Sequence, residues 1–196
     1  HLLHALLGKT PSSAPKDYVI KIFDDYANRF DTHLTDHLEY NMHNMLRDCF
    51  DGYSGLKGKQ INKAFDMGCG TGLCGEAFTG VAKYIYGVDL APNMLKEAEK
   101  KKIYDTLIEG DIVDVLDSQT IKFDLFIAGD SFIYVGELGK LFRSASDRSD
   151  KNSVFVFSTE HVDEGDFVLQ KSGRYAQSFN YIEKLSKKYG FEIIKF

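Results

Sequence analysis

Apolar residues recur along the chain with two different periods, and the change of period divides it into two parts. In the first part apolar residues recur at three- and four-residue steps, which predicts an amphipathic helix carrying Tyr18, Ile22, Phe23, Tyr26 and Phe30. Thr35 or Asp36 is a candidate cap of a second helix, which carries Leu38, Met42, Met45 and Leu46. A polar, glycine-rich loop follows at residues 51–60, and beyond it short apolar runs alternate with helical segments.

The second part predicts an α/β fold. Six runs have the length and composition of strands: Ile61–Met67, Tyr84–Val88, Tyr104–Glu109, Phe123–Ala128, Val154–Ser158 and Phe191–Phe196. Helices are expected between them at Leu73–Ala82, Pro92–Lys101, Val135–Ala145 and Tyr175–Tyr189. This alternation predicts three layers, with a mostly parallel sheet between helices. Ligands of such sheets bind beyond the carboxyl ends of the strands.

Three segments are therefore expected along the chain. Residues 1–15 form a short helical stretch and a linker, "TPSSAP", rich in proline and serine. Residues 16–60 form an N-terminal helical segment, and residues 61–196 form the α/β core. The first residues lack a methionine, a basic region and a long apolar run, so they are not expected to be a signal peptide. They look like the end of an upstream segment.

Composition narrows the class of protein. The chain has 196 residues, enough for one folded core, and its net charge of -5 argues against nucleic acid as a partner. No apolar run approaches the ~20 residues that span a bilayer. Three cysteines without a secretory signal indicate reduced thiols and a cytoplasmic location. No metal site is expected, because Cys69 and Cys74 match no common zinc spacing and no third ligand accompanies His33 and His37.

The segment "FDMGCGTGLCG", residues 65–75, is compatible with two kinds of ligand. Counted from Gly70 it is the G-x-G-x-x-G pattern of dinucleotide sites, whereas counted from Asp66 it is a carboxylate followed by alternating glycines. Glycines allow a tight turn and a close approach of the ligand to the backbone. Asp66 would repel a pyrophosphate and would attract a ligand that carries an ammonium and a sulfonium group.

Two further acids end the next two strands. Asp89 is placed to accept the hydroxyls of a ribose, and Asp111 is placed to accept the amino group of an adenine. With Asp66 they predict an acidic pocket that is unfavourable for phosphates. The alternative for Asp89 and Asp111 is that each caps the helix after its strand.

At these residues the sequence resembles the class I S-adenosylmethionine-dependent methyltransferases. "FDMGCGTG", "GVDLAPNML" and "EGDI" are similar to their glycine, ribose and adenine motifs, and "FDLFIAGDSFIYV" to the strand-four motif that faces donor and acceptor. The resemblance implies a Rossmann-like methyltransferase fold, with S-adenosylmethionine as cofactor and S-adenosylhomocysteine as product. It implies cofactor contacts from Asp66, Gly68, Cys69, Gly70, Gly72, Asp89, Leu90, Met94, Gly110, Asp111, Ile112 and Gly129, and from Tyr26 and Phe30 of the first helix.

A narrower resemblance concerns the flanks of the core. "YVIKIFDDYANRFDTHL" and "LQKSGRYAQS" resemble methyltransferase domains that follow tetratricopeptide repeats in some bacterial proteins, which are similar to quinone and biotin-synthesis methyltransferases. This implies that residues 1–15 are the remnant of a repeat, that residues 16–60 are a lid over the donor, and that upstream repeats bind a protein partner. The family fold has seven strands, the last antiparallel. Six are predicted here, so either the last strand is missing or the sheet edge is altered.

Methyl transfer requires alignment of the acceptor, and a base only where the nucleophile carries a proton at neutral pH. The candidate bases are His33, Asp130, Tyr134 and His161. The motif "AGDSF" lacks the Asn-Pro-Pro-aromatic signature of many enzymes that methylate amino groups of nucleobases or glutamine. A pocket with Phe132, Tyr134, Arg174 and Tyr175 is expected to bind the acceptor. Aromatic walls and one arginine favour a small-molecule or carrier-bound acid, methylated on oxygen or carbon.

Two alternatives belong to other functional classes. The glycine pattern at Gly70, Gly72 and Gly75 also fits an NAD(P)-dependent oxidoreductase. The second alternative is a non-catalytic domain that holds the donor or a partner without turnover.

Overall fold

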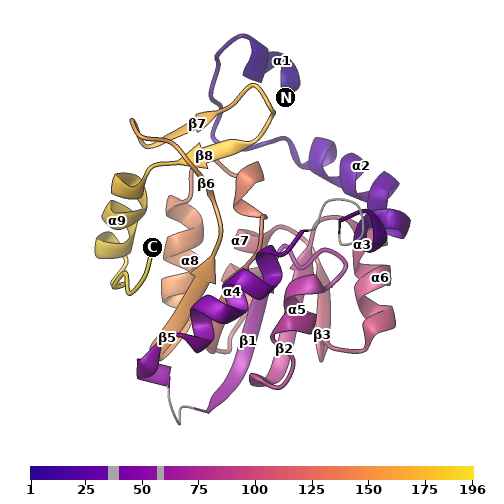
Figure 1. The fold of residues 1–196 in the computed structure, drawn as a ribbon, viewed down its shortest axis with the longest axis vertical. Coiled ribbons are helices and arrows are strands. Elements are labelled where there is room, and N and C mark those ends of the chain that lie inside the picture. The colour runs from indigo at the N-terminus through magenta and orange to yellow at the C-terminus, as the bar shows by residue number, and fades with distance from the viewer. Residues whose placement is uncertain (35–39, 57–59) are drawn as a thin grey trace.

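The protein is built around a parallel β-sheet with helices on both faces (Figure 1). The computed structural model describes residues 1–34, 40–56 and 60–196. Within these residues the main sheet consists of β1 (Ile61–Met67), β2 (Ala82–Asp89), β3 (Thr106–Glu109), β4 (Phe123–Ala128) and β5 (Ser149–Phe157). Their order is β3-β2-β1-β4-β5, and every neighbouring pair is parallel. The three-layer, Rossmann-like fold class expected from the sequence is confirmed.

Helices cover both faces of the sheet. The helices are α1 (Leu2–Leu6), α2 (Lys16–Tyr26), α3 (Phe30–Thr32), α4 (Met42–Asp51), α5 (Leu73–Ala77), α6 (Pro92–Lys101), α7 (Ile112–Ser118), α8 (Gly139–Asp147) and α9 (Phe179–Lys188). Short 3₁₀ turns are η1 (Ala27–Arg29), η3 (Ser54–Leu56) and η4 (Phe132–Tyr134). α4 and α5 lie on one face and α7, α8 and α9 on the other, and in Figure 1 α2 and α3 lie across the ends of the strands near α6.

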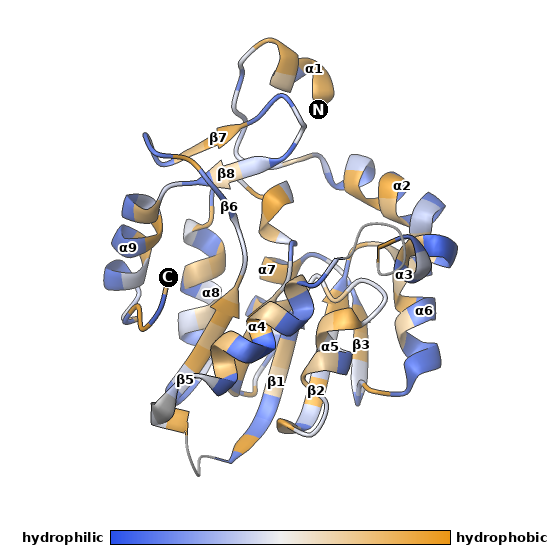
Figure 2. Ribbon diagram, viewed as in Figure 1, coloured by the Kyte–Doolittle hydropathy of each residue, from blue (hydrophilic) through white to orange (hydrophobic). Residues whose placement is uncertain are grey.

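Alternating side chains of the strands supply a hydrophobic core on each face. On β4, Leu125 and Ile127 pack with Phe50 and Phe78 of the α4–α5 side. Phe126 and its alternate neighbours pack on the other side, against α7, α8 and α9. Figure 2 shows the apolar strands between helices whose outer faces are hydrophilic. Strands buried on both faces are expected to be continuously apolar, which is why they stand out in the sequence.

The strand expected at residues 191–196 is not formed, so this prediction was wrong. The backbone N–H of Phe191 donates to the carbonyl of Ser186 at the end of α9, at 2.8 Å, instead of joining the edge of the sheet. Phe191 and Ile193 still pack against the core. The alternation of apolar residues correctly predicted that Phe191 and Ile193 are buried. The hydrogen bond to α9 prevents the segment from pairing as a strand.

Three predicted helices have different bounds in the structure. The first ends early, at Ala77, and β2 begins at Ala82. The helix expected from Val135 begins at Gly139, because η4 precedes it and Val135 pairs with Ser13. The helix expected from Tyr175 begins at Phe179.

A small second sheet precedes α9, and its strand β8 (Tyr175–Gln177) takes the residues that were expected to form the first turn of that helix. β6 (Glu160–His161), β7 (Phe167–Leu169) and β8 form this sheet in the order β6-β8-β7. The hydroxyl of Ser178 then accepts a hydrogen bond from the backbone N–H of Tyr181 at 3.1 Å, which caps α9. A cap of this kind sets where a helix can begin. α7, which was not predicted, begins at the analogous cap made by Asp111.

The linker before α2 is attached to the end of the sheet. The N–H of Ala14 donates to the carbonyl of Tyr134 at 3.0 Å, and the N–H groups of Gly136 and Glu137 donate to the carbonyl of Ser12 at 3.0 and 2.8 Å. α2 therefore starts close to the segment that follows β4. The predicted second-helix features at Thr35, Asp36 and Leu38, and His37, lie outside the described residues. α4 begins at Met42, after Asn41.

Candidate active site

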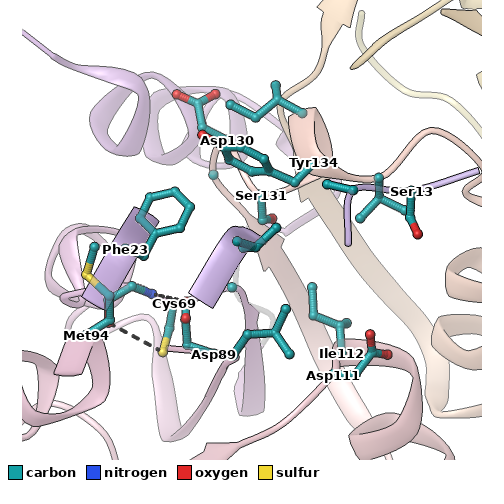
Figure 3. A pocket seen from close by; sticks show the side chains of 18 of the residues that line it. Ser13, Phe23, Cys69, Asp89, Met94, Asp111, Ile112, Asp130, Ser131 and Tyr134 are labelled. Carbon is teal, nitrogen blue, oxygen red and sulfur yellow. Dashed lines mark hydrogen bonds between the residues drawn. The ribbon is translucent and has the colours of Figure 1, made fainter. Parts of the chain in front are cut away.

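A cavity of about 990 Å³ opens where the carboxyl ends of the parallel strands meet the N-terminal helices. Residues after β1, β2, β3 and β4 line it from below, and α2 contributes Phe23 and Tyr26 from the other side. Its volume lies within the range of small-molecule sites, ~300–1,000 Å³. Figure 3 shows Asp111 and Ile112 on one side of this cavity and Asp130 and Tyr134 on the opposite side.

The loop after β1 brings bare backbone to the cavity. Gly68 has φ +72° and packs against Ser131. A Cβ at Gly68 would come within 2.6 Å of Ser131 Cβ. Gly70 has φ +54° and would place a Cβ in open space. L-residues rarely adopt such φ values, so both positions favour glycine. The sequence of the loop thus creates room for a ligand directly beside its backbone.

Asp89 ties this loop to the next strand. Its Oδ2 accepts from the N–H of Gly70 and its Oδ1 from the N–H of Ala91, both at 2.8 Å. Burial raises the pKa of the Asp89 carboxyl, while the backbone donors oppose that rise. Asp89 also lines the cavity, and each carboxylate oxygen has a second lone pair for a ligand hydroxyl. Asp89 can therefore hold the loop in place and bind a ligand at the same time.

Asp111 caps the helix after β3, as the second of its two interpretations expected, and it also lines the cavity. Its Oδ1 accepts from the N–H groups of Val113 and Asp114, at 2.9 and 3.3 Å, which caps α7. Its Oδ2 pairs with Lys16 Nζ at 3.2 Å, and Lys16 also pairs with Asp114 at 3.1 Å. Asp111, Lys16 and Ile112 all line the cavity. The first residue of α2 is thereby held at the β3 end.

Asp66 lies behind the glycine loop. It is fully buried and does not line the cavity; its Oδ2 accepts a hydrogen bond from the hydroxyl of Tyr104 at 2.7 Å. Burial raises the pKa of Asp66 to about 7, against the lowering effect of the Tyr104 bond. Gly72, with φ +94°, also lies against Tyr104 and outside the cavity lining. Any effect of Asp66 on a ligand must pass through the loop backbone.

Two carboxylates, Asp24 and Asp31, hold the N-terminal segment to the glycine loop and to α6. Asp31 accepts a hydrogen bond from the hydroxyl of Thr71 in the glycine loop and pairs with Lys101 Nζ at 2.8 Å. Asp24 accepts from the N–H of Asn93 in the first turn of α6, at 2.8 Å. Carboxylates are favourable at helix N-termini, where backbone N–H groups are free. These contacts place the aromatic side of α2 over the cavity.

The structure brings most of the predicted site residues to this one cavity. Its lining includes Tyr26, Phe30, Gly68, Cys69, Gly70, Asp89, Leu90, Met94, Gly110, Asp111, Ile112, Gly129, Asp130, Tyr134 and Arg174. Burial raises the pKa of the Cys69 thiol, so a reactive thiolate is disfavoured there. Met94 packs with Ala27 and Ala91, so its side chain is part of the hydrophobic core as well.

Besides Asp66 and Gly72, four predicted residues lie outside the cavity lining. Phe132 and Tyr175 are fully buried, the first against Phe155 and Phe157 and the second in the cluster around Leu169, so they do not form pocket walls. His161 is half exposed and pairs with Asp163 at 3.1 Å. His33 bonds to Tyr26 and does not line the cavity. These placements follow from the small sheet and the helix ends, which the sequence did not predict.

Several cavity residues were missed from the sequence. Lys16, Tyr40 and Ser131 all line it. Ile22 and Phe23 also line it, and their place on the predicted apolar stripe of α2 is a signal that could have identified them. Within the described residues no group of three or more metal-ligating side chains occurs, and no helix has the length and apolar character needed to cross a membrane.

This architecture, with a glycine loop after β1 and acids at the ends of β2 and β3, matches the Rossmann-like methyltransferase fold. Residues 65–157 match the family described as "Methyltransferase domain". The chain carries a methyltransferase domain that uses S-adenosylmethionine as its cofactor. The class and cofactor predicted from the sequence are confirmed.

Two curated proteins share sequence with the chain. The biotin biosynthesis bifunctional protein BioHC of Saccharophagus degradans is 28% identical over 79% of this chain, and an 18S rRNA (guanine-N(7))-methyltransferase of Bos taurus is 35% identical over 32% of it. The matched regions cover 26% and 22% of these relatives, so the chain spans about a quarter of their length.

Solved structures share the fold. Magnesium protoporphyrin IX methyltransferase (ChlM) of Synechocystis superposes with a TM-score of 0.71 at 17% identity, covering 92% of this chain and 91% of that one. A methyltransferase of Clostridium acetobutylicum gives 0.65 at 20% identity, covering 86% and 89%. At these identities the similarity concerns the fold alone.

Proposed function

We propose that the chain binds S-adenosylmethionine in the cavity and catalyses methyl transfer to a small-molecule or carrier-bound acid. The main support for the donor site is the hydrogen bond between Asp89 and the backbone of Gly70, which leaves open space beside the glycine loop. When bound, the donor supplies an electrophilic methyl group. The protein's part is to hold it, to align the acceptor and to exclude water.

The residues around the cavity fit this donor. Asp89 offers carboxylate oxygens for ribose hydroxyls, and Leu90 and Ile112 offer apolar surface for an adenine. The hydroxyl oxygen of Ser131, shielded from solvent and without a hydrogen-bond partner among the described residues, is available at the junction of the β1 and β4 ends. Carboxylates at two strand ends disfavour a pyrophosphate, which counts against an NAD(P) site.

Binding of the demethylated product tests the donor site directly. We expect S-adenosylhomocysteine to bind in calorimetry and to raise the melting temperature, while NAD and NADP leave it unchanged. Stabilisation by a nicotinamide cofactor alone would rule out the proposal. Donor binding without release of S-adenosylhomocysteine, across a broad panel of acceptors, would favour a non-catalytic binding domain.

The acceptor is proposed to lie between α2, the β4 end and Arg174. Phe23 and Tyr134 meet edge to face, with ring centroids 5.3 Å apart, and form an aromatic wall. Arg174 lines the cavity and pairs with Glu160 at 3.2 Å, so a carboxylate of the acceptor would have to replace Glu160 as its partner. An arginine fork binds a carboxylate well, and its half-exposed position makes the exchange feasible.

Two opposite substitutions test this part of the proposal. Arg174→Ala is expected to raise KM for an acidic acceptor about tenfold, because one charge-assisted bond is lost. Glu160→Gln is expected to lower that KM, because Arg174 loses its competing partner. Affinity for S-adenosylhomocysteine should stay constant in both. Steady-state kinetics with the best acid from a product-release screen measures this; a nucleic acid as best acceptor, or a change in donor affinity alone, would contradict it.

Residues 18–34 are proposed to be a lid that closes on the donor. Hydrogen exchange of their amides should slow when S-adenosylhomocysteine is added, because a bound ligand reduces local opening. Asp31→Ala should reduce this protection, since it removes the contacts to Thr71 and Lys101. Asp25→Ala, at an exposed position of α2, serves as the matched control. Exchange that is identical with and without ligand would argue against a lid.

A further inference from the structure

The first turn after β4 holds a carboxylate in an uncommon backbone conformation. Asp130 has φ +51°, one of the few described non-glycine residues in the left-handed region. Such conformations cost free energy in most residues and recur at functional sites. The turn places Asp130 between Gly129 and Ser131, both of which also line the cavity.

Ser158, at the end of β5, fixes the orientation of this carboxylate. The N–H of Asp130 donates to Ser158 Oγ at 2.8 Å, and the Ser158 hydroxyl donates to Asp130 Oδ1 at 2.7 Å. The two bonds close a ring between neighbouring strand ends. Ser158 bonds Oδ1, and the Tyr40 hydroxyl is a further hydrogen-bond partner of the carboxylate, so Asp130 faces both the strand end and the aromatic side of the cavity.

The surroundings of Asp130 are aromatic and carry little compensating charge. Tyr40 lies close enough for the charge of Asp130 to raise the pKa of its hydroxyl, in addition to the larger effect of burial. Arg174, the nearby cation, is paired with Glu160. Burial also raises the pKa of Tyr134, which keeps both phenols protonated at neutral pH. Asp130 is therefore the group here that can accept a proton.

The other candidate bases and carboxylates are engaged elsewhere. His33 bonds to Tyr26, and His161 pairs with Asp163, both outside the cavity lining. The remaining lining carboxylates have their own partners: Asp89 the glycine loop, Asp111 and Asp114 Lys16, Asp117 Arg143, and Glu137 the N–H of Gly139. Figure 3 shows Asp130 near Ser131 and Tyr134, across the cavity from Asp111.

We propose that Asp130 is the general base of this site, receiving the proton of a hydroxyl, amine or acidic carbon on the acceptor, with Ser158 as its positioning residue. The inference rests on the proposed methyltransferase function. The acceptor atom forms its bond to the methyl carbon while the carbon–sulfur bond breaks, and that electron pair stays on sulfur as a thioether. The proton of the acceptor passes to Asp130 and then to solvent.

A donor analogue tests the position of the carboxylate without any acceptor. In sinefungin a CH–NH₃⁺ group replaces the S⁺–CH₃ group, so its ammonium occupies the path of the methyl group. We expect Asp130→Asn to weaken sinefungin binding about tenfold or more, the loss typical of one charge-assisted bond, and to leave S-adenosylhomocysteine binding within twofold. Asparagine tolerates the left-handed conformation, so this variant should keep the fold.

Asp124→Asn is the matched control, because Asp124 lies at the start of the same strand, where it accepts from the N–H groups of Asn62 and Lys63. Asp124→Asn should not change the ratio of the affinities for sinefungin and S-adenosylhomocysteine. Equal affinities of Asp130→Asn and the unchanged protein for sinefungin, or equal weakening of both ligands, would overturn the assignment. Failure of S-adenosylhomocysteine to bind the unchanged protein would instead overturn the proposed function, and the base with it.

Kinetics then test the chemical role. Asp130→Asn should lower kcat about 100-fold for acceptors that carry a proton on the nucleophile, with donor affinity kept. Ser158→Ala should lower kcat less, and Asp130→Glu should restore part of it. An equal loss with an ionised carboxylate acceptor, which needs no base, would overturn the proposal, as would turnover of carboxylates only.

Discussion

Replacing Asp89 by alanine is expected to weaken binding of S-adenosylhomocysteine by about 100-fold or more, two charge-assisted bonds being lost at ~1.5–3 kcal/mol each. The carboxylate has two tasks at once. It accepts from the N–H of Gly70, which shapes the loop, and it faces the cavity where ribose hydroxyls are proposed to bind. Asp89→Asn keeps one acceptor oxygen and should lose only about tenfold.

Calorimetry on three variants measures this effect. Glu109→Gln is the matched control, because Glu109 is the register partner of Asp89 on β3 but is exposed and outside the cavity lining. Its affinity should equal that of the unchanged protein. Circular dichroism shows whether Asp89→Ala remains folded. Affinity within threefold of the unchanged protein would refute the role of Asp89 in donor binding.

Asp66→Asn is expected to stabilise the protein at pH 8 and to have little effect near pH 4. Burial raises the pKa of Asp66 to about 7, from an ordinary value of 3.8. The folded state therefore holds a proton that the unfolded state releases, and the contribution of this group to stability falls as pH rises from about 4 to 7. A shift of this size corresponds to roughly 4 kcal/mol between the two limits.

Urea unfolding at several pH values tests this expectation. The difference in free energy of unfolding between Asp66→Asn and the unchanged protein should grow with pH across that window. Tyr104→Phe is the informative companion, because it removes the hydrogen bond that lowers the pKa of Asp66. Its stability should fall further toward high pH. A difference that does not vary with pH would show that Asp66 stays ionised in the folded state.

Much of the fold could be predicted from the sequence because its signals are local. β1 and β4 have the predicted bounds, since most of their residues are apolar and buried and they lie between polar loops. The order of strands and helices implied a parallel sheet, and a parallel sheet gathers the strand ends at one edge. That rule alone predicted that Gly70, Asp89 and Asp111 would be neighbours.

The residues that complete the site depended on tertiary structure. Lys16 pairs with Asp111, Asp31 bonds to Thr71, and Tyr40 lies beside Asp130, although each pair is far apart in the sequence. No periodicity or motif specifies such contacts, because they follow from how the N-terminal segment packs across the strand ends. Tertiary packing also buried two residues of the expected pocket in the core, Phe132 against Phe155 and Phe157, and Tyr175 beside Leu169.

The sequence by itself thus determined the order of elements, the glycine loop and the row of acids, since these depend on backbone freedom and on hydrophobic burial within short segments. The tertiary structure alone decided that Asp66 lies behind the loop and that Asp89 closes it. It also decided that Asp130 is held toward the cavity by Ser158. The physical reason is that the direction of a side chain, its burial and its pKa are set by neighbours that the chain brings together only when it folds.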